Sequence, residues 1–226
     1  MNAVLGNPVY HGLCSGDAHL AFGTEKVKHF DEEVSPFAGF DENYVNGFKE
    51  LGELFPAGRI VLYATRRTIP EPKNWNLLQE VKGVQFVYNK EVKLQYESMA
   101  LVPLHANHSE EMVQLTALTK PGPFNSRTIE FGNYFGIFDN GRLVAMAGER
   151  LHPGNYTEIS AVCTHPDYLG KGFAASLIKH QVDLIQEQNR IPFLHVRADN
   201  ERAISLYERL GFVQNDHMNF YVLKRS

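Results

Sequence analysis

Two glycines that flank a lysine are the feature of this 226-residue chain that most directly predicts chemistry. Gly170, Lys171 and Gly172 follow an expected strand at residues 156–164 and open a long amphipathic helix. Glycine adopts positive φ values and lets a ligand approach the backbone closely. The first N–H groups of a helix have no intrahelical partner and lie at the positive end of its dipole. The segment therefore predicts a site for an anion, with phosphate as the first candidate.

Three interpretations of this loop compete. It is not a Walker A motif, because no Gly-Lys-Ser/Thr closes it. It does fit Gly-x-Gly-x-x-Ala with Asp199 at the end of the next strand, as in a dinucleotide-binding unit. However, five residues separate the strand from Gly170, and only 27 residues follow Asp199, too few for the rest of a doubly wound sheet. In the third interpretation the glycines serve only a tight turn.

The same loop resembles the GNAT superfamily of CoA-dependent acyltransferases, whose motif is Gln/Arg-x-x-Gly-x-Gly/Ala between the fourth strand and a long helix. Gly170 and Gly172 match, whereas Asp167 stands where glutamine or arginine is usual. A second match, to Asn-x-x-Ala-x-x-x-Tyr-x-x-x-Gly-Phe, runs from Asn200 to Phe212. The resemblance covers roughly residues 99–226 and is nearest to the glycine N-acyltransferase-like branch.

The resemblance implies acetyl-CoA (CoA) as the cofactor and direct transfer of its acyl group to an amine. It implies that the pantetheine arm lies along the backbone of Val162, Cys163 and Thr164, with the Val162 N–H as oxyanion donor. The residues implied for the pyrophosphate are Leu169, Gly170, Lys171, Gly172, Phe173 and Ala174. Further CoA contacts are implied for Asn200, Ala203 and Tyr207, although an asparagine at this position also caps its helix.

Attack of an amine on a thioester needs a deprotonated amine, a stabilised oxyanion and a protonated thiolate. The resemblance implies that Tyr207 is the general acid. A phenol with a reference pKa of about 10 stays protonated at neutral pH and can donate. The alternative is that Tyr207 only packs, since it shares a helical face with Ala203 and Leu210.

For the general base we predict Glu158, on the third strand of a meander and four residues before Val162. Glu149 and His152, at the end of the hairpin, remain alternatives, and a strand glutamate otherwise lies on a solvated face. A cysteine nucleophile at Cys163 is not favoured, because the family transfers the acyl group directly. The ten histidines show no spacing typical of a metal site.

An antiparallel meander followed by a βαβ crossover predicts a mixed α/β sheet, here a GNAT-type acyltransferase fold. Asp139-Asn140-Gly141 is a strong hairpin signal within it. The strands expected are residues 100–104, 134–138, 143–147, 156–164, 193–198 and 220–223. The helices expected are one capped by Ser109, one after Gly172 and one at residues 200–210 closed by Gly211.

The polar stretch at residues 90–97 divides the chain into an N-terminal α/β region, 1–97, and a catalytic acetyltransferase domain, 98–226. The first region is expected to form a helix at 48–55, a strand at 60–64, a helix carrying Trp75, Leu77, Leu78 and Val81, and a strand at 84–88. This order repeats that of residues 173–223. The front half is therefore a candidate degenerate copy that covers a sheet edge or shapes the substrate pocket, with an unrelated extension as the alternative.

Composition narrows the class of protein further. A net charge of −4 argues against a general nucleic-acid binder. No apolar stretch approaches the roughly 20 residues that span a bilayer, and the first residues show no secretory signal. Cys14 and Cys163 are expected to be reduced thiols. We therefore expect a cytoplasmic acyltransferase for an amine-bearing small molecule or peptide; the rival is a non-catalytic CoA-binding sensor, and a homodimer stays open.

Overall fold

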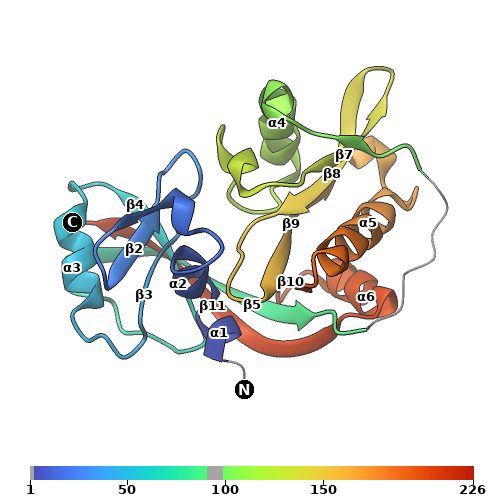
Figure 1. The fold of residues 1–226 in the computed structure, drawn as a ribbon. Coiled ribbons are helices and arrows are strands. Elements are labelled where there is room, and N and C mark those ends of the chain that lie inside the picture. The colour runs from blue at the N-terminus through green and yellow to red at the C-terminus, as the bar shows by residue number, and fades with distance from the viewer. Residues whose placement is uncertain (1–2, 91–98) are drawn as a thin grey trace.

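The computed structural model describes residues 3–90 and 99–226. As expected, the fold is mixed α/β: a large sheet, a small sheet and helices packed against them (Figure 1). The small sheet is β1 (Ala21–Gly23), β2 (Val27–Phe30) and β3 (Ala38–Phe40). The large sheet has the order β4-β11-β5-β10-β9-β8-β7-β6. Its strands are β4 (Ile60–Thr65), β5 (Trp75–Val87), β6 (Val102–Pro103), β7 (Phe135–Asp139), β8 (Arg142–Glu149), β9 (Tyr156–Thr164), β10 (Ile191–Arg197) and β11 (Val213–Arg225).

Helices cover both faces of the large sheet. The α-helices are α1 (Ala3–Gly6), α2 (Pro8–Leu13), α3 (Gly47–Leu54), α4 (Ser109–Thr119), α5 (Phe173–Glu187) and α6 (Glu201–Leu210). Met112 of α4 packs with Met146 on one face, whereas Leu177 of α5 packs with Val144 and Ala147 on the other. Among the helices that the structure describes, none is long and apolar enough to cross a membrane.

Local turn and cap signals account for much of the C-terminal region. Asn140 and Gly141 have φ values of 48° and 78°, so β7 and β8 form the expected hairpin. Gly211 closes α6 in the left-handed conformation, and the Asn200 side chain accepts a hydrogen bond at its start. The expected cap at Ser109 is wrong, because Ser109 is the first helical residue and its hydroxyl donates to a backbone oxygen of the loop before β7.

The helix expected around Trp75, Leu77, Leu78 and Val81 is wrong. These residues form the first half of β5, which pairs with β11 along almost its whole length. Leu77 and Leu78 are both substantially exposed, so their spacing does not reflect a buried helical face. Pairing with a distant strand overrides the local apolar pattern.

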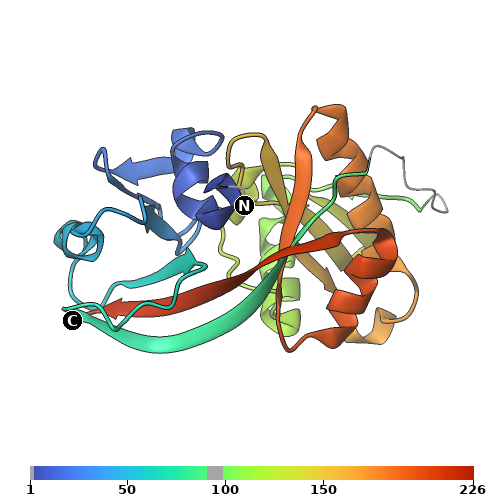
Figure 2. The ribbon, with the colours of Figure 1, turned by 90° about the horizontal axis from the view of Figure 1, so that it is seen from below.

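Strand β5 joins the two regions of the chain in one sheet. It pairs antiparallel with both β10 and β11, so these two strands of the C-terminal region do not contact each other as neighbours. Figure 2 shows β5 and β11 running side by side between the two halves of the molecule. The region before residue 97 therefore supplies an internal strand to the sheet that carries the candidate site.

Candidate active site

Strand β9 carries a bulge at Ala161. Between its pairs with Met146 and Gly148 of β8, the register advances three residues on β9 but only two on β8. Ala161 has a φ of 51°, a left-handed conformation that alanine rarely adopts. Neither Ala161 nor Val162 has a register partner on the described parts of β8 or β10. A bulge of this kind leaves backbone groups unpaired and redirects the side chains that follow.

The faces on which the β9 side chains lie change at the bulge. Ile159 and Val162 both pack in the cluster beneath α5 and α6. Ala161 and Cys163 pack in the cluster on the opposite face, beneath α4. Regular alternation would put Ile159 and Ala161 on one face, so the extra residue reverses the facing of everything after it.

Beyond Glu158, β9 and β10 no longer pair. Their recorded parallel pairing comprises only Tyr156–Ile191, Thr157–Pro192 and Glu158–Phe193 within the described residues. On their outer sides β9 continues to pair with β8, and β10 with β5. Each strand thus has an unpaired edge toward the other beyond this point. We call the gap between residues 159–164 of β9 and residues 194–197 of β10 the β9–β10 split.

The loop after β9 leaves consecutive backbone amides free. Gly170 and Gly172 have φ values of 82° and 79°, and the first backbone hydrogen bond of α5 runs from Ser176 N to Gly172 O. Among the described residues, none accepts a backbone hydrogen bond from the amides of residues 170–175, which we call the amide nest. Residues 169–172 are exposed. Free amides at the start of a fifteen-residue helix form a site that suits an anion.

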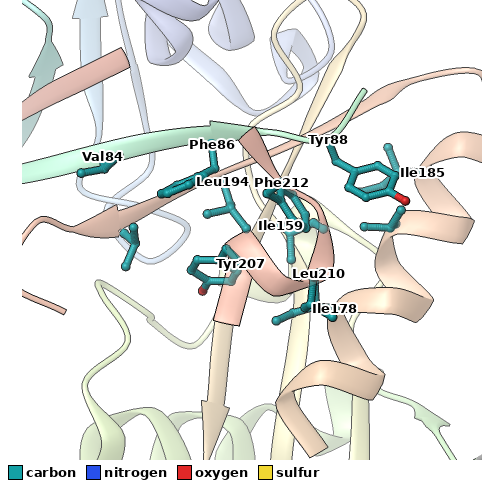
Figure 3. Packing of buried hydrophobic residues seen from close by; sticks show 12 residues of the cluster. Val84, Phe86, Tyr88, Ile159, Ile178, Ile185, Leu194, Tyr207, Leu210 and Phe212 are labelled. Atoms are coloured by element: carbon teal, nitrogen blue, oxygen red, sulfur yellow. The ribbon is translucent and has the colours of Figure 1, made fainter. Parts of the chain in front are cut away.

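Tyr207 lies on the α5/α6 face of the split. It is 7% exposed and packs with Ile159 of β9 and Leu194 of β10. In Figure 3 its hydroxyl points away from the rings of Phe86 and Phe212. No hydrogen bond to this hydroxyl is recorded among the described residues, and burial raises its pKa to about 12. The phenol is therefore a protonated donor throughout the neutral range.

Glu158 lies on the opposite face, where its side chain is fully buried. Its Oε1 accepts hydrogen bonds from Arg150 Nη2 at 2.6 Å and from His195 Nδ1 at 2.7 Å, and Oε2 accepts one from Arg150 Nε at 2.8 Å. Burial alone would raise the pKa of this carboxyl, but Arg150 and His195 outweigh it and lower the pKa to about 2. Glu158 is thus charged at neutral pH and accepts a proton poorly.

His195 is a member of this site that the motifs did not indicate. It stands two residues after Phe193, the partner of Glu158, so alternation along β10 brings both side chains to the face of Glu158. That relation is the signal from which it could have been found, but only once the register of β9 and β10 is known.

Glu149 and His152, the alternative bases, belong to a separate buried cluster. His152 Nδ1 lies 2.6 Å from Asp17 Oδ1, and Nε2 lies 3.2 Å from Glu149 Oε2. Burial opposes the charged imidazole, but the two carboxylates outweigh it and raise the pKa of His152 to about 9. This cluster ties the segment after α2 to the turn between β8 and β9.

The remaining expected residues fall into two groups. The backbones of Val162, Cys163 and Thr164 line the split, whereas burial raises the pKa of the Cys163 thiol to about 11, so it stays uncharged. Asn200 uses its side chain to cap α6 through the Ala203 amide at 3.1 Å. Within residues 3–90 and 99–226, no group of three or more His, Cys, Asp or Glu side chains could hold a metal ion.

Comparison with known proteins agrees with this geometry. Residues 134–221 match the family model described as FR47-like protein. The crystal structure of a GNAT-family protein from Novosphingobium aromaticivorans covers 100% of both chains with a TM-score of 0.92 and 29% identity. Spermidine N(1)-acetyltransferase of Vibrio cholerae is 39% identical over 70 residues, 28% of this chain and 40% of that protein. N-alpha-acetyltransferase RimI of Mycobacterium tuberculosis is 32% identical over 97 residues, 41% of this chain and 60% of that protein.

A mixed sheet that splits between two parallel strands, followed by an amide nest, defines the class of GNAT-type acyltransferase folds. In its whole fold, and over residues 134–221 in its sequence, the chain is similar to GNAT-family acetyltransferases. It spans only 40% and 60% of the length of the two curated relatives. The finer resemblance, to the glycine N-acyltransferase-like branch, is not confirmed by these matches.

Proposed function

We propose that this chain is an N-acetyltransferase that moves an acetyl group from acetyl-CoA directly to a primary amine. The observation that carries the proposal is the continuity of the site: one strand, β9, carries the bulge, borders the split and leads into the amide nest. Tyr207 stands beside the same split. The six amides of the nest have no backbone acceptor among the described residues and lie at the positive end of α5, where an anion is stabilised.

The residues present suit the parts of CoA. The amide nest would hold the diphosphate, with Lys171 beside it; its Nζ now lies 4.5 Å from the centre of the Tyr168 ring. The unpaired edge of β9 at Val162, Cys163 and Thr164 would bind the pantetheine arm through its backbone groups. Bound acetyl-CoA supplies the thioester that the amine attacks.

The chain's own groups would then manage charge and protons. The Val162 N–H, which lies at the bulge and has no register partner on the described parts of β8 or β10, would stabilise negative charge on the carbonyl oxygen. Tyr207 would donate its proton to the leaving sulfur, because burial keeps the phenol protonated.

Glu158 would act by its charge. A carboxylate with a pKa of about 2 cannot hold a proton taken from an amine at neutral pH. It can, however, stabilise the positive charge that appears on the nitrogen as the nitrogen attacks. The proton would then pass to water, and the amine would need to enter in its neutral form.

The substrate class that we infer is a primary amine on a small molecule or peptide. The names of the two curated relatives point to a polyamine in one case and to a protein α-amine in the other. Both carry a primary amine, which is the chemistry they share. We also propose a cytoplasmic location, in keeping with two free cysteines, Cys14 and Cys163.

The test is release of free thiol from acetyl-CoA in the presence of a panel of polyamines, amino acids and peptides. Turnover with at least one amine supports the proposal. Tight CoA binding with no turnover across the panel would instead support the non-catalytic sensor, and in that case Tyr207→Phe would leave CoA binding unchanged.

A further inference from the structure

A buried chain of hydrogen bonds connects β5, from the N-terminal region, to Glu158. Gln85 on β5 is fully buried. Its Nε2 lies 2.9 Å from His195 Nε2 and 3.0 Å from the carbonyl oxygen of Leu5. Its Oε1 accepts a hydrogen bond from Asn215 Nδ2 at 2.6 Å. One side chain therefore bridges α1, β10 and β11.

These contacts define the protonation of the His195 ring. The Leu5 carbonyl can only accept, so Gln85 Nε2 is the amide nitrogen and donates. The charged Glu158 carboxylate also only accepts, so His195 Nδ1 carries a hydrogen. The lone pair of the neutral ring is then on Nε2, where it accepts from Gln85. A hydrogen on Nε2 would set two donors face to face.

Among the described residues, few other polar or charged groups lie near the His195 ring to affect which of its nitrogens carries a hydrogen. Its side chain is 5% exposed, and its ring packs edge-on against Phe193 of β10 and Phe220 of β11. The charged groups that face it are Glu158 of β9 and, behind that carboxylate, Arg150. On β11 the nearby acid Asp216 is paired with Arg66 at 3.1 Å.

We propose that Gln85 is a positioning residue: it holds His195 as the neutral Nδ1–H tautomer, and the imidazole in turn fixes the Glu158 carboxylate beside the β9–β10 split. The inference rests on the proposed function, in which the charge of Glu158 assists the attacking amine. It also gives the inserted strand β5 a part in building the site. In metal sites, loss of a partner that orients a ligand commonly costs about 10- to 100-fold in affinity or activity, and we take the same range for Gln85.

The first test is independent of activity. In ¹⁵N-labelled wild-type protein at pH 7, the His195 ring should show one protonated nitrogen, Nδ1, and one unprotonated nitrogen, Nε2. Gln85→Glu replaces the donor by an acceptor and should convert the ring to the doubly protonated form. Gln79→Glu, an exposed glutamine on the same strand, is the matched control and should leave the ring unchanged. A wild-type ring with its hydrogen on Nε2 would overturn the proposal.

The second test separates kcat from KM. Gln85→Glu should lower kcat about tenfold or more, because His195 would no longer hold the Glu158 carboxylate in its present position. The KM for acetyl-CoA should stay unchanged, because the amide nest contains none of these residues. Unchanged kcat in a folded Gln85→Glu protein would overturn the positioning role. If the wild-type ring is as expected but the wild-type protein transfers no acetyl group, the proposed function fails and the hydrogen-bond chain stands.

Discussion

Tyr207 and Glu158 lie on opposite faces of the same sheet, at the point where β9 and β10 separate. Tyr207 packs with Ile159 and Leu194, whereas Glu158 binds His195. His195 directly follows Leu194 on β10, so the two side chains lie on opposite faces of the sheet. In the proposed function, a group held in the split would have the neutral Tyr207 phenol on one side and the Glu158 carboxylate, held by Arg150 and His195, on the other. This polarity suits a reaction in which positive charge develops at the nitrogen and negative charge at the sulfur.

Tyr207→Phe should lower kcat by about 10² to 10⁴, the usual size of a general-acid contribution. No hydrogen bond of the hydroxyl is recorded among the described residues, so its removal should leave the urea midpoint of unfolding unchanged. Steady-state kinetics with acetyl-CoA and the best amine measures the effect. A wild-type kcat would remove Tyr207 from the mechanism.

The pH dependence of kcat/KM should follow the amine and not Glu158. With a pKa of about 2, Glu158 stays deprotonated over the accessible range, so its own titration contributes no limb near neutral pH. A peptide α-amine and a lysine side chain have ordinary pKa values of about 8 and about 10.4. The acid limb should therefore move to higher pH for the lysine side chain. The same midpoint for both amines would show that an enzyme group takes the proton.

Stability should fall at alkaline pH because of His152. Its pKa is raised from an ordinary value of 6.5 to about 9 in the folded protein, so its contribution is fully present below about pH 6.5 and is lost as pH rises through 9. Urea unfolding at pH 6 and pH 9.5 measures the loss. Asp17→Asn should reduce the difference between the two pH values, whereas His19→Gln, at an exposed histidine, should preserve it. An equal difference in the Asp17 variant would contradict the assignment.

A fragment of residues 98–226 should fail to fold alone, although it carries both sequence motifs. Without β5, its strands β10 and β11 lose the neighbour that both pair with, and Val84 and Phe86 leave the cluster around Tyr207. Poor amide dispersion in a ¹⁵N correlation spectrum is the expected result, with recovery when residues 1–97 are co-expressed. A well-dispersed spectrum of the fragment alone would show that the C-terminal region is autonomous.

The features that sequence predicts best here are those determined by a few adjacent residues. Asn140-Gly141 fixes a hairpin, and Gly172 and Gly211 mark the start and end of helices, because each needs a backbone conformation that few residues adopt. The strand at residues 156–164 was predicted with the bounds that it has. These elements carry the amide nest and one edge of the split.

What the sequence could not reveal depends on distant partners. The bulge occurs at Ala161, and alanine is not a residue type that favours a positive φ, so the local sequence does not predict the bulge. Strand β5 pairs with β11, more than a hundred residues away, and its exposed leucines imitate a helical pattern. Glu158 was predicted as a base from its position, but its low pKa follows from Arg150 and His195, which reach it only through the folded sheet.

The central claim, that the amide nest grips the diphosphate of CoA, is tested most directly by calorimetric titration of CoA into Gly172→Asp and Gly141→Asp proteins. The two glycines have nearly the same positive φ, 79° and 78°, so both variants force a side chain into the left-handed region, but only one adds a carboxylate to the nest. Gly172→Asp should weaken CoA binding by about tenfold or more, because like charges repel at close range, and Gly141→Asp should bind as the wild type does. Equal affinity in the two variants would contradict the assignment of the nest.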